Sequence, residues 1–136
     1  MKNIFGPICV ESLAAEEIIS EREKLGWKIF RLPSEISSKD DFFDGVRCLL
    51  SLDPPLRSNR SWDALADSLW AGLDNISEGN IIIVWPNVSE MKSNAPRDFD
   101  IAINILSDLS MSFLNSEVSN SPAKNILILQ LNNGTR

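Results

Sequence analysis

The chain has 136 residues, of which 43% are hydrophobic and 24% charged, and its net charge is −6 at pH 7. This length and composition are those of one ordinary soluble globular domain that can bury a core without disulfides or metals. The negative charge argues against nucleic acid and anionic membranes as partners and favours a basic partner. Histidine is absent, so the commonest general base and transition-metal ligand are missing and a conventional Ser-His-Asp triad is impossible.

Cysteine usage and the N-terminal sequence indicate an intracellular protein. Cys9 and Cys48 are too few for a disulfide framework or a metal site, and we expect both to be reduced. The N-terminal segment has no apolar run of signal-peptide length, and no stretch approaches a membrane span. Glycine-rich nucleotide motifs, C-x-x-C and H-E-x-x-H are also absent. We therefore expect a cytoplasmic protein, with no cofactor, no metal and no membrane contact, that is not an enzyme.

The first part of the chain predicts a strand, a helix and a second strand. Residues 4–10 are short and apolar, and the glycine and proline among them favour an edge position or a bend. Residues 11–25 carry apolar side chains among charges, which indicates a helix, and Gly26 follows where a C-terminal capping glycine belongs. Residues 27–32 alternate apolar and polar side chains, as strands do, and a proline ends them.

The middle of the chain predicts two helices and the strongest strand. Ser38 opens a helix that runs to about Leu52, with Asp41 at capping-box spacing and an Asp-Pro-Pro sequence to end it. A polar loop leads into a second helix at 61–74. Residues 81–85 (Ile-Ile-Ile-Val-Trp) are apolar on both faces. This pattern is typical of a parallel strand covered by helices on both sides.

The last part of the chain predicts a long helix and a final strand. A loop at 87–95 holds one helical turn, and the helix at 96–114 has a proline at its first position, where the missing N–H is harmless. A polar loop at 115–123 precedes an apolar strand at 125–131, and residues 132–136 form a frayed tail.

This order of elements predicts an α/β fold. Strands separated by helices form parallel sheets with right-handed crossovers. We expect a small parallel β-sheet of three strands packed with helices, with the first predicted strand as a candidate fourth. One domain at 1–136 is expected, in which a β/α extension at 1–26 precedes a core at 27–131.

The helix at 61–74 has two distinct stripes, and Ser61 is its expected N-cap. Apolar side chains at i, i+3, i+4 and i+7 spacing form the stripe that should pack on the core. That stripe consists of Trp62, Leu65, Ala66, Leu69 and Leu73. A second stripe, about 120° round the helix, consists of Asp63, Asp67, Trp70 and Asp74. The core does not need this second stripe, and its carboxylates repel one another slightly at i, i+4 spacing.

Three interpretations of the second stripe are open. It is a solvated face with Trp70 packed under a neighbouring loop, or it is a binding surface in which an aromatic anchor is ringed by negative charge. Alternatively, Asp63 and Asp67 are a carboxylate pair for acid–base chemistry or for a divalent cation. No basic residue lies between Arg60 and Lys92. This gap favours a surface that meets a basic partner.

The same helix carries a resemblance to a known family. Its sequence Trp-Asp-Ala-Leu-Ala-Asp-Ser-Leu at 62–69 resembles the central motif of the barstar family, roughly L-D-A-L-x-D-x-L. The flanking segments also resemble the family in order: the strand at 27–32, the helix at 38–52, the strand Ile-Ile-Ile-Val-Trp-Pro-Asn and the closing helix and strand. The resemblance covers about residues 27 to 131.

The resemblance implies an intracellular ribonuclease inhibitor whose acidic second helix plugs the basic active site of the enzyme in a 1:1 complex. Carried over to this chain, Asp67 matches the family's main carboxylate, and Asp63 matches the carboxylate one turn before it. Asp108 matches a later contact from the long helix. Trp70 would add apolar contact area, and Asp74 continues the acidic stripe. The alternative function is a non-inhibitory acidic protein–protein interaction module.

The sequence departs from the family just before the acidic helix. Aromatic residues are usual there, whereas this chain has Leu-Arg-Ser-Asn-Arg, which makes Arg57 and Arg60 candidate contacts. Ala66 stands where the family often has tryptophan, and tryptophan occurs at 70 instead. These departures suggest a partner other than the best-known small secreted ribonuclease, such as a bacterial toxin domain paired with its own immunity protein.

Overall fold

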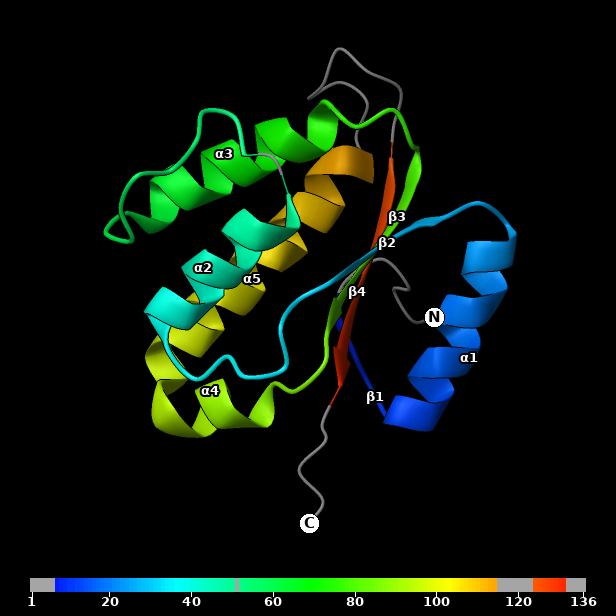
Figure 1. Cartoon of the computed structure of the whole chain (residues 1–136), viewed down its shortest axis with the longest axis horizontal. Coiled ribbons are helices and arrows are strands. Elements are labelled where there is room, and N and C mark those ends of the chain that lie inside the picture. Colours follow the sequence, from blue (N-terminus) through cyan, green and yellow to red (C-terminus); the bar gives the residue numbers. More distant parts are fainter. Residues whose placement is uncertain (1–6, 51, 115–123, 132–136) are drawn as a thin grey trace.

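The computed structural model describes residues 7–50, 52–114 and 124–131 (Figure 1). They form four strands and five helices, in the predicted order. The elements are β1 (Pro7–Val10), α1 (Ser12–Lys24), β2 (Lys28–Arg31), α2 (Lys39–Leu49), α3 (Trp62–Asp74), β3 (Asn80–Trp85), α4 (Ser89–Asn94), α5 (Pro96–Leu114) and β4 (Asn125–Leu131). The start of the first predicted strand, the loop at 115–123 and the tail at 132–136 lie outside the described residues.

All four strands belong to one parallel sheet, in the order β1-β4-β3-β2. β3 and β4 are central, and β1 and β2 form the two edges. β1 pairs with β4 from Pro7 opposite Ile128 to Val10 opposite Leu131. The N-terminal extension therefore supplies a fourth strand, as predicted, and it lies at an edge, where a proline without an N–H is tolerated.

The sheet is covered on both faces, as the apolar sequence of its central strand predicted. Ile81, Ile83 and Trp85 of β3 belong to the larger core, with residues of α2, α3 and α5. Ile82 and Val84 belong to a smaller core on the other face. This division follows the alternation of side chains along a strand. Figure 1 shows α1 on one side of the sheet and α2 to α5 on the other.

α1 covers the second face of the sheet with two fully buried side chains. Ala15 and Ile19 are 0% and 1% exposed and belong to the same core cluster as Ile82, Val84 and Leu129. Without α1, these side chains of β3 and β4 would face water. The N-terminal extension is thus part of the packing of the sheet, as well as an additional edge strand.

Gly26 ends α1 as predicted, and its φ of 93° is a conformation that favours glycine. Its N–H donates to the carbonyl of Glu23 at 3.0 Å, and the N–H of Trp27 donates to the carbonyl of Arg22 at 3.1 Å. This pair of hydrogen bonds defines a Schellman motif. It directs the chain from α1 into β2.

The start of α2 follows the predicted capping box only in part. The Asp41 N–H donates to the Ser38 Oγ at 3.1 Å. The Asp41 carboxylate, however, accepts hydrogen bonds from the Ser37 N–H and Oγ, both at 3.1 Å, one residue earlier than the box requires. The bond from the Ser37 backbone lowers the pKa of Asp41 below the ordinary value for aspartate.

α2 ends three residues earlier than predicted, at Leu49 instead of Leu52. Leu50 has extended backbone angles, with φ −132° and ψ 151°. Both Leu50 and Leu52 are buried in the larger core. The chain therefore leaves the helical conformation at Leu50, before the prolines, and both leucines pack in the core.

Candidate functional site: the exposed face of α3

Both ends of α3 are held by hydrogen bonds. At the start, the N–H of Ala64 donates to the Oγ of Ser61 at 3.1 Å, which confirms the predicted N-cap. Beyond the end, the buried Lys124 donates from Nζ to the carbonyl oxygens of Ile76 at 2.7 Å and Glu78 at 2.9 Å. The ammonium thereby ties the turn after α3 to the start of β4. Nothing in the local sequence indicated this role for Lys124.

The buried side of α3 differs from the predicted apolar stripe. It consists of Leu65, Ser68, Leu69, Gly72 and Leu73. Ala66, which the helical wheel placed on the core side, is only partly buried. Ser68 and Gly72 are buried on this side, and the backbone of the preceding loop reaches the helix there: the Asp53 N–H donates to the Ser68 carbonyl at 3.3 Å. The helical wheel contains no such contact with the preceding loop, so it could not predict the burial of these two small residues.

The opposite side of α3 presents the predicted carboxylates. Asp63 and Asp67 are exposed, and neither has a hydrogen bond or an ion pair with any residue that the structure describes. Asp74, the last residue of the helix, is partly buried. The carboxylates of Asp63 and Asp67 are thus available to an external cation, and their role in binding stays a prediction.

Trp70 packs against the core, although the sequence pattern placed it on the stripe of α3 that the core was not expected to need. Its ring stacks on the ring of Phe113, with centroids 5.0 Å apart and an interplanar angle of 14°. The side chain is partly buried against the larger core. The expectation that the core has no use for Trp70 is therefore wrong, because α5 passes beside α3 and brings Phe113 against the ring.

A pocket of about 190 Å³ lies between α3 and α5 and is called the α3–α5 pocket below. Asp67 of α3 and Asp108 of α5 both line it, although they are far apart in the sequence. Its other walls are Ala66, Trp70, Ile105, Leu109 and Ser112. Two carboxylates beside an aromatic ring suit a cationic side chain, which carboxylates bind through charge-assisted hydrogen bonds and ring faces attract.

The loop before α3 is held by Arg47, a residue of α2 that sequence reasoning missed. Its Nε donates to the carbonyl of Leu56 at 3.2 Å, and its Nη2 donates to the carbonyl of Ser58 at 3.0 Å and to the side-chain oxygen of Asn59. The only local signal was a basic residue in the last turn of a helix. The predicted Arg57 and Arg60 lie in this loop, and both are exposed.

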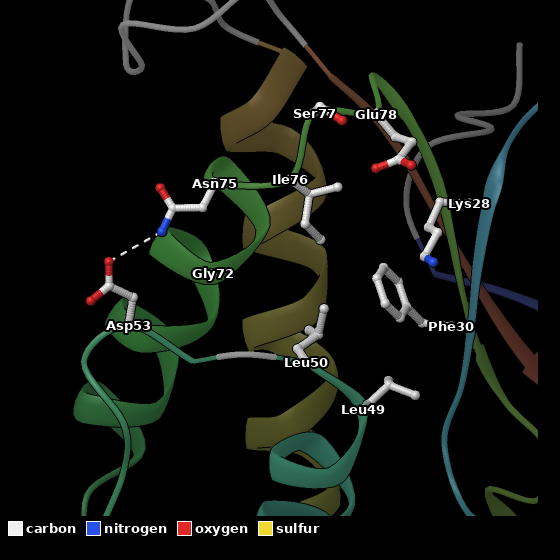
Figure 2. A pocket seen from close by; sticks show the side chains of 10 residues that line it. All are labelled: Lys28, Phe30, Leu49, Leu50, Asp53, Gly72, Asn75, Ile76, Ser77 and Glu78. Atoms are coloured by element: carbon white, nitrogen blue, oxygen red, sulfur yellow. Dashed lines mark hydrogen bonds between the residues drawn. The ribbon is translucent and has the colours of Figure 1, made fainter.

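A larger pocket of about 610 Å³ opens at the other end of α3 (Figure 2). Its apolar walls come from β2, from the end of α2 and from the turn after α3, and include Phe30, Leu49 and Ile76. At its rim the Asn75 side-chain amide donates to the Asp53 carboxylate at 3.1 Å. No residue predicted for the site lines this pocket, so it is separate from the acidic face of α3.

The described residues offer no cage for a metal ion, since no three His, Cys, Asp or Glu side chains among them are grouped as ligands. Asp63 and Asp67 therefore have no third ligand in this part of the chain. None of the helices in the described ranges is long and apolar enough to cross a membrane.

Comparison with known proteins identifies the family. A family model described as Barstar (barnase inhibitor) matches residues 27–121. This range begins just before β2 and includes α2, α3, β3, α4 and α5, whereas β1 and α1 precede it. No curated protein and no solved structure gave a significant match. Because the matched range covers well over half of the chain, the protein belongs to the barstar family.

Proposed function

We propose that this protein is an inhibitor that binds a basic ribonuclease and covers its active site with the exposed face of α3. Membership of a family described as a barnase inhibitor supports this proposal. The partner is a toxin made by the same bacterium or its kin, as in toxin–antitoxin or contact-dependent growth inhibition systems. The protein then acts as a cytoplasmic immunity protein, forms a 1:1 complex and has no catalytic activity of its own.

The observation that carries the proposal is the state of Asp63 and Asp67. Both are exposed and have no partner among the described residues, on a helix whose two ends are held. A ribonuclease active site must hold phosphates, so it is basic and concave. Carboxylates on a rigid helix can replace those phosphates and accept charge-assisted hydrogen bonds from arginine and lysine. Holding the helix beforehand lowers the entropy that binding must overcome.

The α3–α5 pocket gives the proposed interface a second element. Asp67 and Asp108 line it together with Trp70, so one basic side chain of the ribonuclease can enter between two carboxylates and contact the aromatic ring. Asp74 continues the acidic surface toward the end of α3. Arg57 and Arg60 border its beginning.

The test is inhibition of RNA cleavage. The immobilised protein first captures its partner from lysate of the source cells and their neighbours at low salt, and high salt releases it. The released nuclease is then titrated with the protein while cleavage of a labelled RNA is followed. We expect complete suppression at one equivalent. Capture of a partner without nuclease activity, or binding that leaves cleavage intact, would favour the non-inhibitory interaction module instead.

Asp67→Asn should weaken inhibition by at least about tenfold and leave the melting temperature unchanged, because a hydrogen bond to a charged group contributes about 1.5–3 kcal/mol. Glu17→Gln is the matched control, since Glu17 is exposed on α1, across the sheet from α3, and the change also removes one negative charge. If both variants weaken inhibition equally, net charge and not the α3 surface is responsible. If Asp67→Asn unfolds the protein, Asp67 is structural.

A further inference from the structure

Two arginines beside the acidic helix have no partner within the described part of the chain. Arg57 and Arg60 are exposed, and neither makes an ion pair or a hydrogen bond through its side chain to a described residue. Asp63 follows Arg60 by three residues, and its carboxylate is likewise unpaired. Positive and negative side chains thus follow one another closely in the sequence here, without an ion pair between them.

The backbone that carries these arginines is nevertheless firmly held. The Nζ of Lys39 donates to the carbonyl of Arg60 at 3.0 Å and lies 5.5 Å from the centre of the Trp62 ring. The side-chain amide of Asn59 donates to the carboxylate of Asp40 at 3.0 Å, and Arg47 holds the preceding carbonyls. The loop is therefore ordered by other side chains, which leaves the two exposed guanidinium groups free for an outside ligand.

The course of the loop brings its end to the start of the acidic helix. Its beginning is bonded to the middle of α3 through the Asp53 N–H and the Ser68 carbonyl. From there it runs back to the start of the helix at Trp62 (Figure 1). Arg60 directly precedes the N-cap Ser61, so a ligand that covers the first turn of α3 lies near Arg60 as well as Asp63.

We infer that Arg57 and Arg60 bind carboxylates that border the basic cleft of the partner ribonuclease. This inference rests on the proposed function. A uniformly basic partner would be repelled by two guanidinium groups at the edge of the interface. Arginine, with its planar fork of donors, is the side chain best suited to bind a carboxylate in two places. RNA phosphate is the less favoured ligand, because unpaired carboxylates follow the arginines within a few residues of the chain and the whole chain is acidic.

Charge reversal tests the inference, because it should weaken binding to carboxylates but strengthen binding to a uniformly basic partner. Arg57→Glu and Arg60→Glu are made singly, and the dissociation constant is measured with the ribonuclease that the unaltered protein inhibits. Each variant should bind at least about tenfold more weakly, because an attraction becomes a repulsion. The control is Lys24→Glu, which makes the same change of net charge at an exposed position on α1 and should alter affinity less than about twofold.

Unchanged or tighter binding by both arginine variants would overturn the inference, since a uniformly basic partner gains from added negative charge. A second measurement changes each carboxylate at the border of the ribonuclease cleft to lysine in turn. At least one such change should restore binding of Arg57→Glu or Arg60→Glu while weakening that of the unaltered protein. Absence of any such rescue would also count against the inference.

Two further outcomes separate this inference from its alternatives. If the protein alone binds labelled single-stranded RNA, and Arg57→Glu abolishes that binding, the arginines contact RNA and the inference is wrong. If the unaltered protein inhibits no ribonuclease, the proposed function fails and the inference fails with it. If the unaltered protein inhibits the ribonuclease and both charge-reversal variants bind it with unchanged affinity, only the inference is rejected.

Discussion

Asp41 shows how one carboxylate sets the position of a helix. Its oxygen accepts two hydrogen bonds from Ser37, while its own N–H donates to the hydroxyl of Ser38. The residue therefore ties Ser37 and Ser38, just before α2, to the first turn of the helix. Since α2 carries Arg47 and Lys39, which hold the loop before α3, the site depends indirectly on this carboxylate.

Asp41→Asn should destabilise the fold by about 1 kcal/mol at neutral pH, the usual contribution of a hydrogen bond. Hydrogen bonds lower the pKa of Asp41 in the folded protein. Its contribution is therefore present above the unfolded-state pKa and is lost as the pH falls through the lower, folded pKa. Urea denaturation from neutral pH down to about pH 3 should show a smaller loss of stability in the variant than in the unaltered protein.

The control for this prediction is Asp100→Asn, which changes an exposed aspartate of α5 without a described partner. Its pH dependence should match that of the unaltered protein. Parallel curves for the Asp41→Asn variant and the unaltered protein would show that the carboxylate contributes nothing to the acid sensitivity of the fold.

At the scale of elements, the position of α3 depends on the segments before and after it. The loop before it is held by Arg47, and the turn after it by Lys124. Ser68 provides a third attachment, because its carbonyl accepts a hydrogen bond from the backbone of the same loop. The helix is thus presented as a fixed surface whose exposed carboxylates need little rearrangement to meet a partner.

Arg47→Ala should destabilise the protein by about 1 kcal/mol, because it removes the side-chain hydrogen bonds that hold the loop. Amide hydrogen exchange in residues 56–60 should become faster. Arg57→Ala is the control in the same loop, and its effect should stay within about 0.5 kcal/mol, since its side chain is exposed and has no described partner. Equal stability of both variants would contradict a role for Arg47 in ordering the loop.

At the scale of the whole molecule, the N-terminal unit completes a sheet that would otherwise have one open face. β1 adds an edge strand to β4, and α1 packs on the side of the sheet away from α3. The family match begins only at residue 27. The strands of the matched region nevertheless bury apolar side chains against α1, so we propose that residues 1–136 form one domain.

Ile19→Ala tests this single-domain organisation. Ile19 is 1% exposed, and its truncation should lower the free energy of unfolding by about 2–4 kcal/mol while one cooperative transition remains. Leu13→Ala in the same helix is the control, because Leu13 is 81% exposed and should have little effect. A separate early transition in the Ile19→Ala variant, with the main transition unshifted, would show that the extension folds independently.

The net charge of −6 makes a prediction for the complex. Affinity for a basic ribonuclease should fall as salt rises, because surface charges are screened over about 10 Å at 0.1 M ionic strength. The dissociation constant measured at several salt concentrations checks this directly, with the association rate showing most of the change. Affinity that is independent of salt would indicate an interface dominated by apolar contacts, such as those of Trp70.

Local features of the structure could be predicted from the sequence because neighbouring residues determine them. The cap at Ser61, the left-handed Gly26 and the buried strand at 81–85 follow from short-range sterics, hydrogen bonding and side-chain alternation. The motif at 62–69 likewise indicated the family and the exposed carboxylates of α3. The elements outside the described residues and the role of the α3 carboxylates in binding stay predictions.

Contacts between distant segments could be established only from the tertiary structure. The pocket shared by Asp67 and Asp108 and the hydrogen bonds of Arg47 join residues that no local pattern relates. The stacking of Trp70 on Phe113 likewise depends on how α5 crosses α3. The physical reason is that periodicity fixes which side of a helix is apolar, whereas the neighbouring segments decide how much of that side is covered and which polar groups meet.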